Sequence, residues 1–249
     1  MYETICYKKN YLTKVIVRID FPAPIPDLKN KISPIFTKSV MEFFPVAEPR
    51  KSIRQELKIT ADELKQKRTE FTEWRFKGLK SEKTLTIIPN AIFIDYTSYN
   101  NFEQLKEEFL GVLKSFFLSY EDMVGSRLGL RYINNIELEN NDPLSWEGYI
   151  KNQLLCLFKF YEEPECLARI FHNIGLNFDY FNLRYQFGMH NPDFPLTIRK
   201  KIFVLDFDAY SQSPHEFENI SNHLDDFHYR IQELFEKSIT ENYRGLLNA

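Results

Sequence analysis

The first regular segment of the chain alternates between apolar and polar side chains. In residues 11–21, Val15, Val17 and Ile19 fall on one face, and Arg18 falls on the other. Alternation with period two, carried by β-branched residues, predicts a strand with one face in the core.

Two later segments change to helical spacing. Ser33 followed by Pro34 is typical of a helix start, because serine caps the first free N–H groups and proline is tolerated at the first position. Apolar residues then recur at steps of three and four until Pro45 ends the helix. The clearest helix is predicted over residues 102–120, with Asn101 as its N-cap.

The remaining elements of the first half are predicted from shorter patterns. Residues 50–72 are dense in charge and weakly periodic, so we interpret them as a solvated segment with one strand near residues 56–60. Further strands are predicted over residues 73–78, 84–89 and 91–98.

The second half predicts a similar order of elements. A strand is expected over residues 127–138 and a helix over residues 146–158, followed by strands over residues 167–172, 176–187 and 198–210 and a helix over residues 217–240. A repeat with a long period is stronger evidence for the fold than local patterns are. We therefore expect two α+β repeats, residues 1–124 and 125–249, packed as one compact unit.

Matching residues recur at similar positions in the two halves. Arg18 aligns with Arg131 within a strand, and Asp95 aligns with Asp206 in the strand before each long helix. These matches predict an α+β fold made by tandem duplication of a strand–helix–antiparallel meander–helix unit. The helices are expected to cover one face of a curved antiparallel sheet.

The alternation also assigns charged residues to the uncovered sheet face. Arg18, Arg127, Arg131, Asp95 and Asp206 are expected there, and Asp208 follows on the same strand face. Three roles remain open for these residues. They could form cross-strand ion pairs on an exposed face, line a groove that binds an anion or a partner, or, for Asp206 and Asp208, bind Mg²⁺.

Composition narrows the function classes. The chain has 249 residues, a net charge of −3, 43% hydrophobic and 16% aromatic residues, and only 8 glycines. A near-neutral charge argues against broad coating of nucleic acid. We find no glycine-loop, nucleophile-elbow or zinc-protease motif.

The cysteine and histidine spacings offer no metal or disulfide framework. Cys6, Cys156 and Cys166 are widely spaced, and His223 and His228 lie on different faces of a helix. The N-terminal residues lack the apolar stretch of a signal peptide, and no run suits a membrane span. We expect a cytoplasmic protein.

Several blocks together resemble a sporadically distributed, uncharacterised family of prokaryotic proteins of about this length. The strongest block is RLGLRYIN at residues 127–134, with VIVRIDFP at 15–22 and LDFD at 205–208 in support. The resemblance covers almost the whole chain. It carries no activity or cofactor, and the patchy distribution of the family implies an accessory or defence gene module.

Three hypotheses about function remain. The first is a non-enzymatic interaction or ligand-binding protein whose partner is a protein or an anionic small ligand. The second is a metal-dependent phosphodiesterase or nuclease that uses Mg²⁺ on Asp206 and Asp208. The third is a nucleic-acid-binding saddle, which the net charge disfavours.

Overall fold

The computed structural model describes residues 5–59, 64–120, 123–139 and 142–249. The strands in this part of the chain are β1 (Leu12–Asp20), β2 (Val46–Ala47), β3 (Arg50–Ile59), β4 (Leu64–Lys77), β5 (Lys83–Ile88), β6 (Ala91–Tyr96), β7 (Arg127–Glu137), β8 (Ile170–Asn177), β9 (Asn182–Met189) and β10 (Ile202–Ser211). The α-helices are α1 (Pro34–Phe43), α2 (Phe102–Ser119), α3 (Phe217–Ser238) and α4 (Glu241–Asn248). The 3₁₀ turns are η1 (Asp27–Lys29), η2 (Asn152–Leu154), η3 (Cys156–Lys159) and η4 (Pro164–Cys166).

The protein has an α+β fold with a large antiparallel sheet. Hydrogen-bonded neighbours follow the order β2-β4-β5-β6-β1-β7-β10-β9-β8, and β3 pairs with β4 outside this order. The ladders whose register is described are all antiparallel. None of the described helices is both long and apolar enough to cross a membrane.

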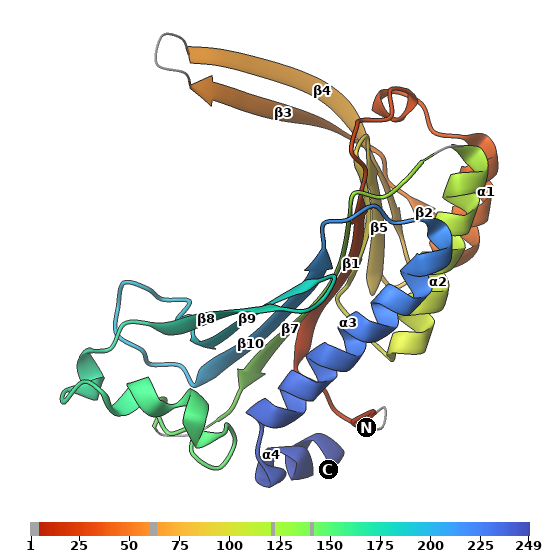
Figure 1. Cartoon of the computed structure of the whole chain (residues 1–249). Helices are drawn as coiled ribbons and strands as arrows, with labels where there is room; N and C mark the ends of the chain where they lie inside the picture. The colour runs from red at the N-terminus through yellow and green to blue at the C-terminus, as the bar shows by residue number, and fades with distance from the viewer. Residues whose placement is uncertain (1–4, 60–63, 121–122, 140–141) are drawn as a thin grey trace. The chain divides into compact units, whose positions relative to one another are not determined.

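The chain divides into two compact units. Unit 1 comprises residues 1–15, 129–211 and 222–249, and unit 2 comprises residues 16–128 and 212–221. Figure 1 shows the elements of both units coloured along the chain.

Aromatic side chains form the core of each unit, as their placement on strand faces and helix stripes predicts. In unit 2, Phe21 stacks on Phe116 of α2 at 5.2 Å between ring centroids. In unit 1, Tyr185 of β9 stacks on Phe207 of β10 at 4.6 Å, and both rings are buried. Burial of such large apolar rings is a major stabilising contribution to each unit.

The predicted helix starts are confirmed in atomic detail. The Ser33 side chain accepts a hydrogen bond from the Phe36 N–H, with Pro34 in the first helical position. The Asn101 side chain accepts one from the Gln104 N–H at 2.8 Å. Both caps supply acceptors to N–H groups that have no partner within the helix.

Three local predictions are wrong. The segment over residues 50–72, expected to be solvated with one strand near residues 56–60, instead contains two long strands, β3 and β4, joined by ten cross-strand pairs; residues 60–63 lie outside the described part of the chain. The helix expected over residues 146–158 is a series of turns, because Gly148 adopts φ +100° and Ile150 bridges to Ile239. The break between the next two strands falls at residues 178–181 rather than 173–175, since the Phe178 N–H bonds to the Phe181 carbonyl and closes the turn there.

Candidate functional site

The charged residues predicted for one strand face of unit 1 lie on the face opposite its buried apolar side chains. On β7, Leu130 and Tyr132 are buried whereas Arg131 between them is partly exposed. On β10, Leu205 and Phe207 are core residues, so Asp206 and Asp208 point to the other face. The predicted assignment of residues to faces is therefore correct for these strands.

Arg131 and Asp206 form a two-point ion pair across neighbouring strands. Arg131 donates from Nε to Asp206 Oδ1 at 2.8 Å and from its terminal NH2 group to Oδ2 at 2.6 Å. Only 8% of the Asp206 side chain is exposed, against 32% of Arg131. The hydrogen bonds that Arg131 donates to the Asp206 carboxylate raise the pKa of the Arg131 guanidinium. The hydrogen bonds of such two-point pairs between carboxylate and guanidinium groups are short and have a specific geometry.

A second arginine pairs with Asp208, the other predicted aspartate of this face. Arg184 on β9 lies opposite Asp208 in the ladder and donates to its Oδ2 at 3.0 Å. Gln186 lies opposite Asp206 and also opposite Asn173 of β8, so polar residues continue across the face to its last strand. The face of unit 1 is thus a cross-strand polar network.

Two predicted arginines of unit 2 meet at Asp20, an acid on the same strand face as Arg18 that was not among the candidate site residues. Arg18 donates to Asp20 from Nε at 3.0 Å and 3.1 Å, and Arg127 approaches the same carboxylate at 3.7 Å. The Arg18 guanidinium also lies 5.3 Å from the centre of the Phe93 ring. Asp95 is opposite Thr84 in the β5–β6 ladder.

The arginines bear on the proposed Mg²⁺ site. Asp206 and Asp208 each accept a hydrogen bond from an arginine, so a cation would have to compete with two fixed positive charges. Among the residues that the structure describes, no group of three or more acid, histidine or cysteine side chains is arranged for a metal ion.

A buried charged cluster in unit 2 was not predicted either. Glu108 of α2 accepts from Lys83 Nζ at 2.7 Å, from the Tyr96 hydroxyl at 2.8 Å and from Gln104 Nε2 at 2.9 Å. Burial and the neighbouring carboxylate raise the pKa of Tyr96. Because each Glu108 oxygen accepts at least one hydrogen bond from a neighbour in the same unit, this cluster holds α2 against the sheet.

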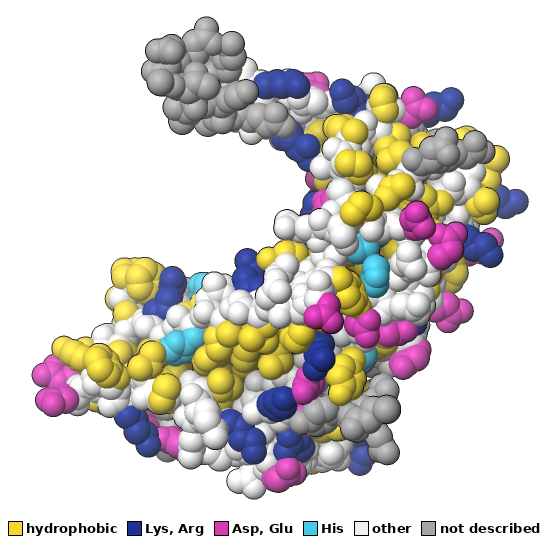
Figure 2. Space-filling view, viewed as in Figure 1, with side chains coloured by type: hydrophobic (Ala, Val, Ile, Leu, Met, Phe, Trp, Pro, Cys, Tyr) yellow, Lys and Arg dark blue, Asp and Glu magenta, His cyan; other side chains and the backbone are white. Residues whose placement is uncertain are grey.

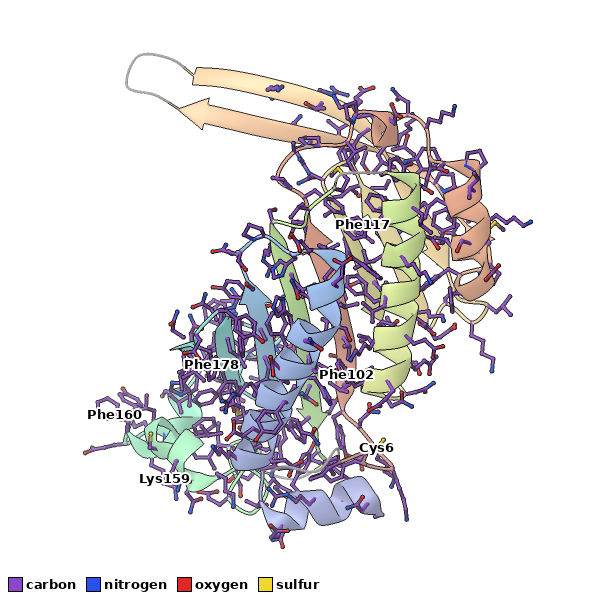
Figure 3. All side chains as sticks on the ribbon, turned by 45° about the vertical axis from the view of Figure 1, so that its right-hand side comes forward. Cys6, Phe102, Phe117, Lys159, Phe160 and Phe178 are labelled. Carbon is purple, nitrogen blue, oxygen red and sulfur yellow. The ribbon has the colours of Figure 1, made fainter. Side chains whose placement is uncertain are left out.

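Unit 2 also has a shallow apolar hollow of about 400 Å³. Phe117 at the end of α2 (Figure 3) meets Phe217 edge to face at 5.9 Å, and Met123 and Val124 complete the apolar part. Glu216 and Glu218 form its rim. An open hollow of this kind has few groups that could fix the orientation of a small molecule.

The most distinctive feature of unit 2 is the β3–β4 hairpin, which we call the arm. It consists of residues 50–59 and 64–73, where β4 pairs with β3 alone, and β4 joins β5 only from Trp74 to Lys77. Figure 1 shows the two strands running out together beyond the other strands of the unit. Ile53, Leu57 and Ile59 are separated by four and two positions, which fits a period of two interrupted at Gln55, a strand signal that the high charge density obscured.

The base of the arm is firmly held. Phe71 packs with Ile88, Ala91 and Phe93 in a small apolar cluster. Arg54 lies over the Phe71 ring at 5.6 Å and donates to the side chain of Asn90 at 3.1 Å. These contacts hold the first residues of the arm against the sheet of unit 2.

Comparison with known proteins adds no assignment. No family model matches the chain, and no curated protein is significantly similar to it in sequence.

Proposed function

We propose that this protein is a non-enzymatic interaction protein and that the arm is its principal contact with a partner. The observation that carries this proposal is the length of paired strand outside the sheet. Ten residues of extended strand span about 30 Å, and the arm has ten such pairs. A two-stranded hairpin is marginally stable alone in water, so a long one held at its base is suited to reaching a second molecule.

The charge of the arm indicates the chemistry of the partner. Its described side chains include five basic residues and two acids, which are Arg50, Lys51, Arg54, Lys67, Arg68, Glu70 and Glu73. Figure 2 shows Lys and Arg side chains along the described part of the arm. The local pairs Arg50–Glu48 at 3.5 Å and Arg68–Glu70 at 3.4 Å are exposed and weak. We therefore propose an acidic protein surface as the partner.

The arginine–aspartate pairs support an interaction protein over a metal-dependent hydrolase. A metal site needs carboxylates with free oxygen lone pairs, whereas Asp206 and Asp208 already bond to Arg131 and Arg184. We propose that these pairs rigidify the uncovered face. Arg18 and Arg127 act in the same way through Asp20.

We further propose that the two halves of the chain are duplicated copies with their long helices on one sheet face. The strand order supports this, since β4-β5-β6-β1 in one half is mirrored by β8-β9-β10-β7 in the other. In each half the last of these strands along the chain precedes a long helix, α2 or α3. A crystal structure in which Arg18 fails to superpose on Arg131, or Asp95 on Asp206, contradicts the duplication.

The function is tested by shortening the arm. Residues 55–68 are replaced by Asn-Gly, which closes a two-residue hairpin after the Arg54–Thr69 pair and keeps the contacts at the base. We expect the melting temperature to change by no more than about 2 °C, because the deleted residues lie outside the sheet of unit 2. Proteins that co-purify with the tagged full chain from its native host should be lost with the shortened chain.

A charge-reversal pair then tests the chemistry with the recovered partner. Lys67→Glu with Arg68→Glu on the arm is compared with Lys80→Glu and Lys114→Glu, which are exposed residues elsewhere in unit 2 and change the net charge equally. The arm variant should weaken binding about tenfold or more, and the control should not. Full retention of partners by the shortened chain contradicts the proposal, and recovery of nucleic acid alone favours the nucleic-acid hypothesis.

A further inference from the structure

The outermost strand of unit 1 is β8. It pairs along its full length with β9, from Ile170↔Met189 to Asn177↔Asn182. Within the described residues, β9 is its only strand neighbour. In an antiparallel ladder, alternate residues of an edge strand direct their N–H and C=O groups away from the sheet. One edge of β8 therefore presents backbone groups suited to pairing with another strand.

The sequence of β8 lacks the devices that usually protect an edge. Its eight residues, IFHNIGLN, include no lysine, arginine, acid or proline. By contrast, β2 at the other end of the strand order has two residues and lies between Pro45 and Pro49. The strand β3 of the arm carries three basic residues in its described part. A neutral edge strand of this length is the one that another strand can join.

Exposed apolar side chains lie along β8 and beyond both of its ends. Ile174 in its middle is 40% exposed. At its N-terminal end, Arg169 lies over the ring of Phe194 at 4.0 Å, and Phe194 and Leu196 are 51% and 59% exposed. Beyond its C-terminal end, Tyr180 is 38% exposed.

We propose that β8 pairs antiparallel with β8 of a second copy of this chain. A twofold axis through the middle of the strand brings the same neutral residues together from both copies, so no like charges meet. The N-terminal end of β8 in one copy then lies beside the C-terminal end of β8 in the other, which places Phe194 and Leu196 of one copy near Tyr180 of the other. A standard interface buries about 800 Å² on each partner, and these apolar flanks enlarge the area that the strand pair alone would bury.

This proposal is independent of the arm, which belongs to unit 2. The test is sedimentation equilibrium of the full chain over a wide range of concentrations, combined with hydrogen exchange of the β8 amides. We expect a concentration-dependent dimer in which alternate β8 amides become more protected as the dimer forms. The chain with the shortened arm should dimerise equally well, so failure of one proposal is distinguishable from failure of the other.

Two matched substitutions locate the contact. Ile174→Lys places a charge in the proposed strand pair, whereas Ile35→Lys changes an isoleucine of α1 that is 80% exposed. The dissociation constant of the dimer should rise about tenfold or more with Ile174→Lys and stay unchanged with Ile35→Lys. A monomer at the highest attainable concentration overturns the proposal, as does a dimer unaffected by Ile174→Lys. If Ile174→Lys lowers the melting temperature, the test rests on hydrogen exchange of the native chain. The contact is then rejected if the β8 amides gain no protection when the dimer forms.

Discussion

Replacing Arg131 by alanine distinguishes a structural ion pair from a ligand-binding group. The change removes two charge-assisted hydrogen bonds, at 2.8 Å and 2.6 Å, from a carboxylate that is only 8% exposed. Breaking a fully buried pair costs about 3–5 kcal/mol, because the remaining charge is left without a partner. One third of Arg131 faces solvent, and water can enter the vacated space, so we expect a loss of about 2–4 kcal/mol.

Arg184→Ala is the matched control on the same strand face. Arg184 makes one hydrogen bond to Asp208 and is 43% exposed, so its loss should cost less than about 1 kcal/mol. Both variants remove an arginine from a largely buried aspartate on β10, 8% exposed for Asp206 and 13% for Asp208. The difference between them therefore measures the second hydrogen bond of Arg131 together with its greater burial.

The assay follows unfolding of unit 1 specifically. Trp146 is buried in unit 1 and is one of two tryptophans in the chain. In a Trp74→Phe background its fluorescence reports urea unfolding of that unit, and an unchanged slope shows that the change is one of stability. If Arg131→Ala lies within about 0.5 kcal/mol of its parent, the structural interpretation is refuted and Arg131 becomes a candidate ligand-binding residue again.

Two further substitutions test buried charges. Lys83→Met leaves Glu108 buried with only its neutral partners and should lower the free energy of unfolding by about 3–5 kcal/mol. Thermal unfolding measures this loss, and adding Glu108→Leu should restore most of the stability. A Lys83→Met variant as stable as the native chain would contradict the prediction. Lys201 is buried without a hydrogen-bond partner for its Nζ, over the ring of Trp146 at 5.3 Å. Burial lowers the pKa of Lys201, so the stability of the native chain should fall as the pH drops below the unfolded pKa of about 10.4. Lys201→Met should raise the free energy of unfolding at neutral pH and make it depend less on pH in urea titrations. A variant that is less stable at neutral pH would show that the ammonium group stabilises the fold by more than its burial costs.

Local signals predicted those parts of the fold that depend on neighbouring residues. Ser33 and Asn101 cap helices because a side-chain oxygen needs only the next turn of backbone to find a donor. The alternation in β1 and β7 placed Arg18 and Arg131 correctly because side chains of a strand point to opposite faces in turn. The helix α4 was missed, although Thr240 caps it, because it is short and follows α3 after two residues.

Two errors arose where distant contacts outweigh local preference. Residues 146–158 have apolar spacing that suits a helix, but the bridge from Ile150 to Ile239 and the left-handed Gly148 fix the segment as turns. The arm was missed for the opposite reason. Its high charge density suggested a solvated segment, and most of its described charged side chains are exposed, but backbone pairing across ten positions needs few buried side chains, here Phe71 and Thr72 near its base.

The sequence alone determined which residues of β1, β7 and β10 share a face, where α1, α2 and α3 begin and that the chain is an α+β protein. It could not determine the partner of each charge. Arg18 pairs with Asp20, two positions away, whereas Arg131 pairs with Asp206, 75 positions away, although the two arginines are equivalent in the sequence pattern. Strand alternation is a property of the local backbone, but the neighbour of a strand depends on how distant segments pack. Only the tertiary structure therefore decided that Asp206 and Asp208 pair with Arg131 and Arg184, that the arm lies outside the sheet and that β8 is an unprotected edge.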